Sequence, residues 1–185
     1  PPSAQPLAST AARFACWLGL VLNLRGEMAV GGGWVARAQR LLETETEDVV
    51  ERGYLLVHGF YQHLARGDLA RAGETAVRLV DTGRRFTDHD LIALGLVTQG
   101  RMMIYSGRVP EGLALLDEAM VEISTAELSP IVAGMVYCAM IEACQEVADF
   151  DRAARWTSAL TAWCDQQPGL VPYTGQCAVH RGQIM

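Results

Sequence analysis

Lysine is missing from this chain of 185 residues: all 15 basic residues are arginine, against 21 acidic residues, for a formal net charge of −6. This absence excludes, within this segment, the lysine of a phosphate-binding P-loop and the lysine that forms a Schiff base. Because the chain is acidic and carries no basic stripe, it is also a poor candidate for direct binding to nucleic acid.

Motifs of metal, redox and hydrolytic sites are missing as well. The five cysteines form an odd set without a CxxC pair or a zinc-ligand spacing, and they lie in apolar helical surroundings, where free cysteine behaves as a small hydrophobic residue. No GxSxG or GxGxxG motif occurs. We therefore expect no catalytic residues, no metal and no cofactor, and a reducing, cytoplasmic location.

A long hydrophobic run is also lacking. The apolar run 14–24 is too short to span a membrane. It has no basic leader with a starting Met, as a signal peptide would have, and it falls in register with later segments of the chain. We interpret it as a buried helix, and we expect no membrane partner.

An internal repeat dominates what the sequence does contain. Gly26, Gly67, Gly107 and Ala148 mark the same point in four successive repeats, 41, 40 and 41 residues apart. Half of the residues are hydrophobic, enough for a continuous core, and no strand-like alternation of useful length occurs. A repeat of this length is typical of stacked helical hairpins that bury their apolar faces against their neighbours. The sequence therefore predicts an all-α fold.

Each repeat consists of a helix A, a turn and a helix B. Asp68 is expected to cap the second helix B, and Ser129 with Pro130 to begin the fourth helix A. A small residue five positions after each turn mark lets helix B approach its partner closely; these residues are Gly31, Ala72, Gly112 and Ala153. We predict a single helical-repeat domain over 1–185, with repeats at about 11–46, 47–87, 88–128 and 129–171 and a partial fifth at 172–185.

This pattern resembles the tetratricopeptide repeat. The matching residues are Leu96, Gly100, Met103, Gly107, Gly112, Leu116 and Ala119, with Gly67, Asp68, Leu69, Ala72 and Ala76 in the second repeat. The resemblance covers nearly the whole chain and implies a right-handed superhelix of antiparallel helical hairpins, an α-solenoid of about nine helices. The spacing of about 41 residues exceeds the 34 of that family, so each helix must be longer.

Three stretches of sequence resemble a more specific family. Residues 33–38, 129–134 and 171–176 resemble segments of actinobacterial LuxR-type regulators, including the large ATP-dependent regulators related to the maltose activator. In that family the repeats lie between a nucleotide-binding part and a C-terminal helix-turn-helix. The resemblance implies a sensor or interaction arm of a transcription regulator, with DNA binding on a helix-turn-helix outside this sequence. The chain opens without Met and closes inside an apolar helical pattern, so we expect a piece of a longer protein.

Helix A lines the concave surface in tetratricopeptide proteins, and this register defines candidate groove residues for a protein or small-molecule effector. They are Tyr54, His58 and Tyr61 in the second repeat, Arg101 and Tyr105 in the third, Glu142, Gln145 and Glu146 in the fourth, and His180 and Gln183 in the partial fifth. Their aromatic rings, arginine and carboxylates could grip a peptide. A solvated groove without a natural ligand is the alternative.

Three other features have structural interpretations. Residues 31–33 are consecutive glycines, which we assign to a flexible helix start or a close helix crossing. Asp88, His89 and Asp90 are assigned to the start of a helix, where acids favour the dipole and cap. Trp156 and Trp163 lie seven residues apart on one helical stripe and are expected to pack in the core.

The leading hypothesis is a non-catalytic effector- or protein-binding module of a LuxR-family regulator. Two alternatives stay open. The chain could be a scaffold or oligomerisation module, forming a homodimer, or a repeat region attached to a signalling enzyme such as a nucleotide cyclase or a kinase.

Overall fold

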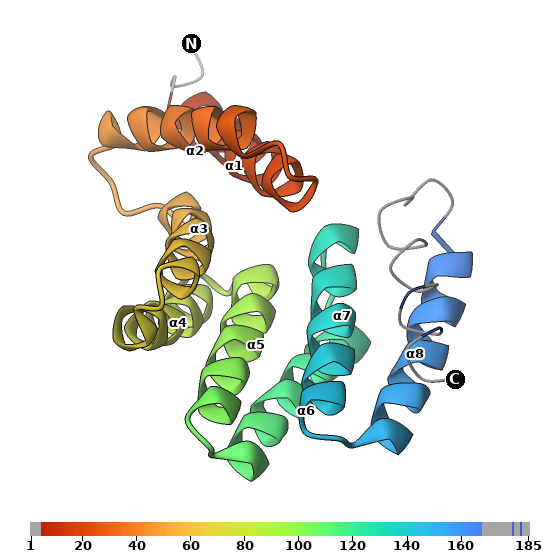
Figure 1. The fold of residues 1–185 in the computed structure, drawn as a ribbon. Helices are drawn as coiled ribbons and strands as arrows, with labels where there is room; N and C mark the ends of the chain where they lie inside the picture. The colour runs from red at the N-terminus through yellow and green to blue at the C-terminus, as the bar shows by residue number, and fades with distance from the viewer. Residues whose placement is uncertain (1–4, 168–178, 180–181, 183–185) are drawn as a thin grey trace. The chain divides into compact units, whose positions relative to one another are not determined.

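The computed structural model describes residues 5–167 together with Val179 and Gly182 (Figure 1). These residues form eight α-helices and no strand, which confirms the all-α prediction for the described part of the chain. The helices are α1 (Gln5–Leu24), α2 (Met28–Glu43), α3 (Glu51–Ala65), α4 (Leu69–Phe86), α5 (His89–Tyr105), α6 (Val109–Thr125), α7 (Pro130–Glu146) and α8 (Phe150–Asp165).

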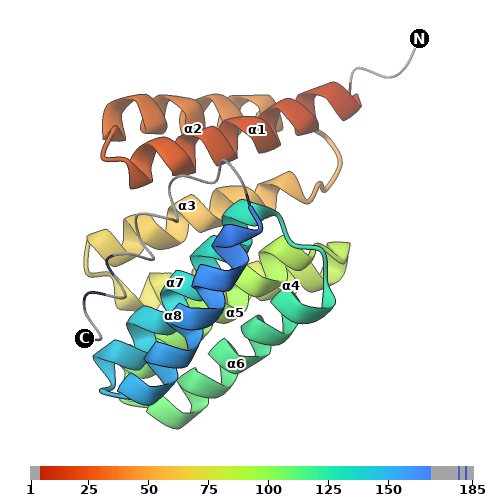
Figure 2. The same ribbon diagram turned by 90° about the vertical axis from the view of Figure 1, so that its right-hand side faces the viewer.

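The chain divides into two compact units, Pro1–Leu91 and Ile92–Met185, which we call the N-terminal and C-terminal units. In the N-terminal unit, α1 lies beside α2 and α3 beside α4, and the two views agree on both pairs (Figures 1 and 2). In the C-terminal unit, α7 packs against α8. The prediction of one domain stays a prediction.

All four turn marks adopt a left-handed backbone conformation, which explains why three of them are glycine. The φ angles are 82° at Gly26, 73° at Gly67, 82° at Gly107 and 61° at Ala148, the left-handed region that glycine enters without steric cost. The amide of the residue after each mark donates to a carbonyl five residues earlier, over 2.9, 3.0, 2.9 and 2.8 Å respectively. Four helix ends are therefore closed by the same Schellman turn.

The small residues of helix B are buried, and Gly31 and Gly112 lie where helix B crosses helix A, as the sequence predicts. Gly31, Ala72, Gly112 and Ala153 are all buried. A Cβ on Gly112 would lie 2.6 Å from the carbonyl oxygen of Gly100, so α5 and α6 meet backbone to backbone. No larger residue fits at that point without displacing a helix.

The odd-numbered and even-numbered repeats carry residues of different size at the equivalent position of helix A. Seven residues before the turn mark, the first and third repeats carry Gly19 and Gly100, whereas the second and fourth carry the buried Phe60 and Ile141. Alanine replaces glycine on helix B wherever the large residue is present on helix A. At these equivalent positions the sequence therefore combines either two glycines or one large residue with alanine.

Side-chain caps begin four helices. The carboxylate of Asp68 accepts from the amide of Arg71 over 3.2 Å, and the hydroxyl of Ser129 accepts from the amide of Val132 over 3.4 Å, as predicted. Asp149 caps α8, accepting over 3.1 Å, and Asp88 caps α5, accepting over 2.9 Å. Capping of this kind satisfies amides that have no partner inside the helix.

Helix lengths account for the long repeat. The eight helices contain 15 to 20 residues each, in line with the expectation that a 41-residue spacing needs long helices. The first helix begins at Gln5, six residues before the expected start at 11, because the helical pattern extends toward the N-terminus. The partial fifth repeat at 172–185 lies outside the described residues except for Val179 and Gly182.

Candidate functional site

The predicted groove residues fall into three groups in the structure. The C-terminal unit contains a cluster of four charged and phenolic side chains, Arg101, Tyr105, Glu142 and Glu146, with Gln145 half-buried beside them on α7. The N-terminal unit contains Tyr54, His58 and Tyr61. His180 and Gln183 lie outside the described residues.

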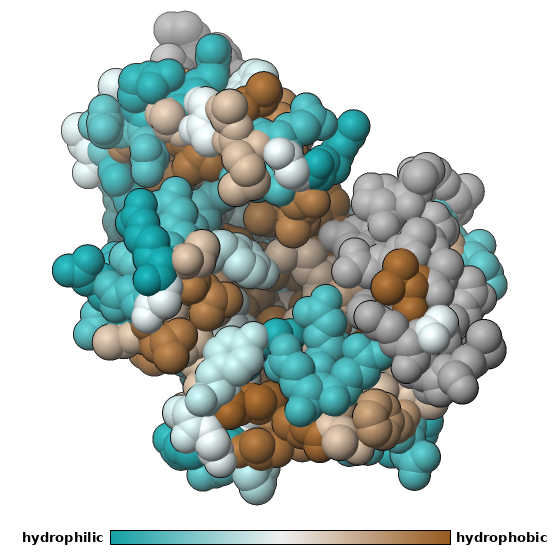
Figure 3. Space-filling view, viewed as in Figure 1, coloured by the Kyte–Doolittle hydropathy of each residue, from teal (hydrophilic) through white to brown (hydrophobic). Residues whose placement is uncertain are grey.

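We call the first group the Arg101 cluster. The guanidinium of Arg101 donates from Nη1 to Oε2 of Glu142 over 3.1 Å and from Nη2 to Oε1 of Glu146 over 2.7 Å. Nη2 also lies 2.5 Å from the hydroxyl of Tyr105. The positions follow from helical spacing: Arg101 and Tyr105 are one turn apart on α5, and the two glutamates are one turn apart on α7. Figure 3 shows hydrophilic side chains over these helices.

The exposure of the cluster is uneven. The side chain of Arg101 is 16% exposed, whereas those of Glu142 and Glu146 are 43% and 39% exposed. Burial by itself would lower the pKa of Arg101, but its hydrogen bond with Tyr105 and the charges of Tyr105, Glu146 and Glu142 raise that pKa overall. The guanidinium is thus fixed and permanently charged, and the carboxylates are accessible from solvent.

The charge balance gives this surface a chemical preference. Two carboxylates face one guanidinium, so one negative charge is left over, and each carboxylate has acceptor capacity beyond its single bond to arginine. The ring of Tyr105 is 42% exposed, and Arg101 lies over it at 5.4 Å from the centroid. The arrangement can accept a cationic or hydrogen-bond-donating group beside an aromatic ring.

In the N-terminal unit the structure corrects the placement of Tyr54 and His58. Their residues are 2% and 6% exposed, because this face of α3 packs against α1 instead of lining an open surface. Tyr61, two turns further along α3, is 38% exposed and packs edge-on against Phe60. The spacing of these residues along α3 predicted that they share a face of the helix. It did not predict that α1 covers part of that face.

A second arginine cluster, which the sequence reading did not predict, surrounds Tyr54. The guanidinium of Arg13 lies 3.0 Å from Oε1 of Glu51 and 3.7 Å from Oδ2 of Asp88, and it stacks over the Tyr54 ring at 4.9 Å. The hydroxyl of Tyr54 donates to the Asp88 carboxylate over 3.0 Å. We call this group the Arg13 cluster. Apart from Glu51 and Tyr54, which share α3, its members are separated by 34 or more residues, so no local motif could reveal it.

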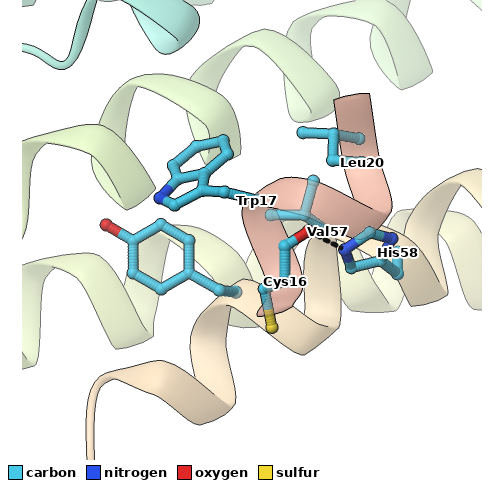
Figure 4. A pocket seen from close by; sticks show the side chains of 6 residues that line it. Cys16, Trp17, Leu20, Val57 and His58 are labelled. Atoms are coloured by element: carbon cyan, nitrogen blue, oxygen red, sulfur yellow. Dashed lines mark hydrogen bonds between the residues drawn. The ribbon is translucent and has the colours of Figure 1, made fainter. Parts of the chain in front are cut away.

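An apolar pocket includes Tyr54 of the Arg13 cluster (Figure 4). Its lining leaves no room for a water molecule and is formed by Cys16, Trp17, Leu20, Tyr54, Val57 and His58. Nε2 of His58 lies 3.0 Å from the carbonyl oxygen of Cys16, and the sulfur of Cys16 points away from the imidazole (Figure 4). Burial raises the pKa of the Cys16 thiol to about 12 and lowers that of His58. These two groups do not form a nucleophile–base pair.

Other predicted features have structural roles. Trp156 and Trp163 both pack on Tyr137, with ring centroids 6.3 and 5.9 Å apart, but both are half-buried, so they border the core instead of lying inside it. Asp88 is a helix cap, as the sequence indicates. Among the described residues, no group of histidine, cysteine and acidic side chains is arranged to hold a metal ion. No helix in the described part of the chain is both long enough and apolar enough to cross a membrane.

Comparisons with family models, with curated proteins and with solved structures give no match. We therefore infer the candidate site from the geometry of the described residues. Of the two arginine clusters, the Arg101 cluster is the one whose acidic groups face solvent, and it contains four of the ten predicted groove residues. We take it as the candidate binding site.

Proposed function

We propose that the chain is a non-catalytic helical-repeat module that binds a protein or small-molecule effector through the Arg101 cluster. The observation that carries the proposal is the pair of exposed carboxylates held by one half-buried guanidinium beside an exposed tyrosine ring. Such a surface favours a partner that presents a basic or hydrogen-bond-donating group together with an apolar one.

The tetratricopeptide-like architecture is part of the same proposal. Four identical turns, four buried small residues and long helices support a right-handed superhelix of antiparallel hairpins with helix A on its inner side. Arg101 and Tyr105 are on the helix A of the third repeat, and Glu142 and Glu146 on that of the fourth. A groove lined by successive A helices would place the cluster on its floor.

A role in transcription regulation extends the proposal through the resemblance to LuxR-family regulators. The module would sense an effector or partner in the cytoplasm and transmit its state to DNA-binding elements outside this sequence. The module itself would not contact DNA, which agrees with the net charge of −6. Tight binding of promoter DNA by this chain at physiological salt would contradict this division of roles.

Peptide binding tests the central claim. A randomised array of short peptides probed with the labelled protein should yield binders enriched in arginine or lysine. The double variant Glu142→Gln/Glu146→Gln should weaken their binding by about tenfold, since it removes both carboxylate charges while keeping hydrogen-bond acceptors.

The matched control is Asp151→Asn/Asp165→Asn, which removes two exposed acidic charges from α8 of the same unit. Equal loss of binding in both double variants would show a general charge effect and contradict the proposal. Circular dichroism of each variant should match that of the parent chain.

Self-association is a second candidate function, favoured by one observation on α1. Phe14 and Leu18 are one helical turn apart and are 69% and 40% exposed. If the chain is a scaffold module, light scattering should show a dimer that Phe14→Glu converts to a monomer. A monomer at all concentrations would rule this function out.

A further inference from the structure

Packing inside the molecule requires glycine at only one of the three consecutive glycine positions of α2. A Cβ on Gly31 would lie 2.1 Å from Oδ1 of Asn23 and 2.9 Å from the carbonyl oxygen of Gly19, so the contact with α1 excludes a side chain there. A Cβ on Gly32 or Gly33 would meet no atom within 4 Å. Glycine is disfavoured in a helix interior relative to alanine, and nothing inside the described molecule requires it at these two positions.

Gly33 lies in a shallow, wide-open hollow on the exposed side of α2. The hollow is lined by Val30, Gly33, Trp34, Arg37 and Arg40. Each lies three or four residues from another member of the set, which places them on one stripe of the helix. Val30 is 54% exposed and Trp34 is half-buried, so the stripe presents apolar surface on both sides of the glycine.

The charges of this stripe are unbalanced. Arg37 and Arg40 are exposed, and neither forms an ion pair with a carboxylate among the described residues; Arg37 instead stacks over the Trp34 ring at 5.8 Å. Other arginines of this acidic chain, Arg13, Arg101 and Arg152, each bind carboxylates. Two free guanidiniums beside an apolar hollow form a local cationic surface that is complementary to an acidic partner.

We propose that this outer face of α2 docks an acidic amphipathic α-helix of another protein. The partner helix crosses α2 at Gly33, in the way that α1 crosses it at Gly31 on the opposite side. Its apolar residues contact Val30 and Trp34, and its carboxylates pair with Arg37 and Arg40. The surface lies in the N-terminal unit and does not depend on the function proposed for the Arg101 cluster.

The probe is a synthetic amphipathic helix of about five turns, with alanine and leucine on one face and glutamate flanking that face. Its affinity for the whole chain is measured by fluorescence anisotropy. A peptide of the same pattern with lysine in place of glutamate is the charge control. We expect the acidic peptide to bind about tenfold or more tightly than the basic one, with a difference that decreases at high salt.

Two leucine substitutions form a matched pair. Gly33→Leu fills the hollow, whereas Gly32→Leu adds the same side chain to the neighbouring open position, off the stripe. Both should raise Tm, because each replaces a helix-interior glycine. Only Gly33→Leu should weaken binding of the acidic peptide, by about tenfold. The double variant Arg37→Glu/Arg40→Glu should reverse the preference and bind the basic peptide.

Three results would overturn the proposal. One is no measurable binding of the acidic peptide by a folded chain. Another is equal binding by the Gly33→Leu and Gly32→Leu variants. The third is a dimer of the parent chain that Gly33→Leu dissociates, since the occupant would then be a second copy of this chain. Loss of binding at the Arg101 cluster would affect none of these measurements.

Discussion

The two arginine clusters use the same groups with opposite exposure. In each, one guanidinium contacts two carboxylates and lies over a tyrosine ring. In the Arg13 cluster the carboxylates of Glu51 and Asp88 are 10% and 12% exposed and the arginine 38%, whereas in the Arg101 cluster the arginine is the buried member. Buried carboxylates fix helices to one another, and exposed ones can bind a partner.

Replacing the tyrosine of each cluster by alanine should give the largest difference in stability between the two clusters. Tyr54→Ala removes a ring that is 2% exposed and packs on Trp17 at 5.2 Å, so it should lower the free energy of unfolding by about 3–5 kcal/mol. Tyr105→Ala removes a ring that is 42% exposed and should cost less than about 1 kcal/mol. Urea denaturation measures both. Equal costs would contradict the assigned roles.

Replacing the arginines should give a smaller difference in stability, and the Arg13 cluster should again lose more. Arg13→Met leaves two largely buried carboxylates without their cation and should cost about 1–3 kcal/mol. Arg101→Met leaves two carboxylates that water can solvate, so we expect about 1 kcal/mol or less. Denaturant midpoints at matched m-values provide the test. A larger cost for Arg101→Met would make the Arg101 cluster the structural one.

Acid should lower the free energy of unfolding through His58, which lies in the N-terminal unit. Burial lowers the folded-state pKa of His58 from 6.5, so its contribution to stability is complete above pH 6.5 and is lost as the pH falls below that value. The expected slope is at most about 1.4 kcal/mol per pH unit. Unfolding measured at pH 7.5 and 5.5 should show a smaller decrease for His58→Gln than for the parent chain. An unchanged decrease would assign the acid sensitivity to other groups.

The repeat turns provide the finest comparison. Ala148 has a φ of 61° where the other repeats carry glycine, so Ala148→Gly should raise the free energy of unfolding by about 0.5–1 kcal/mol. Gly67→Ala, in the N-terminal unit, should lower it by about 1 kcal/mol, because its φ is 73°. Thermal unfolding of the two variants measures these opposite signs. A loss of stability in Ala148→Gly would show that this turn is not strained.

Local features were predictable from the sequence, and distant contacts were not. The turn at Gly107, the cap at Asp68 and the small residue Ala153 each obey rules that act within a few residues. The burial of His58 depends on Cys16, 42 residues away, and no periodicity in α3 reports that contact.

The two clusters illustrate the same limit. The sequence placed Arg101 and Glu142 on successive A helices because both fall at the same phase of the repeat. It did not predict the Arg13 cluster, because Arg13, Glu51 and Asp88 lie at unrelated phases and meet only once α1, α3 and the start of α5 are in place. Repeat phase places equivalent positions on equivalent helix faces and gives no information on residues at different phases.

The alternation of glycine and large residues at the helix crossings has a consequence for how such an array can change length. Gly19 and Gly100, like Gly31 and Gly112, are 81 residues apart, so the pattern recurs every two repeats. Inserting or deleting one repeat would join two like crossings in succession. A duplication or deletion of two repeats preserves the alternation, which makes the pair of repeats the natural cassette for evolution or engineering of this chain.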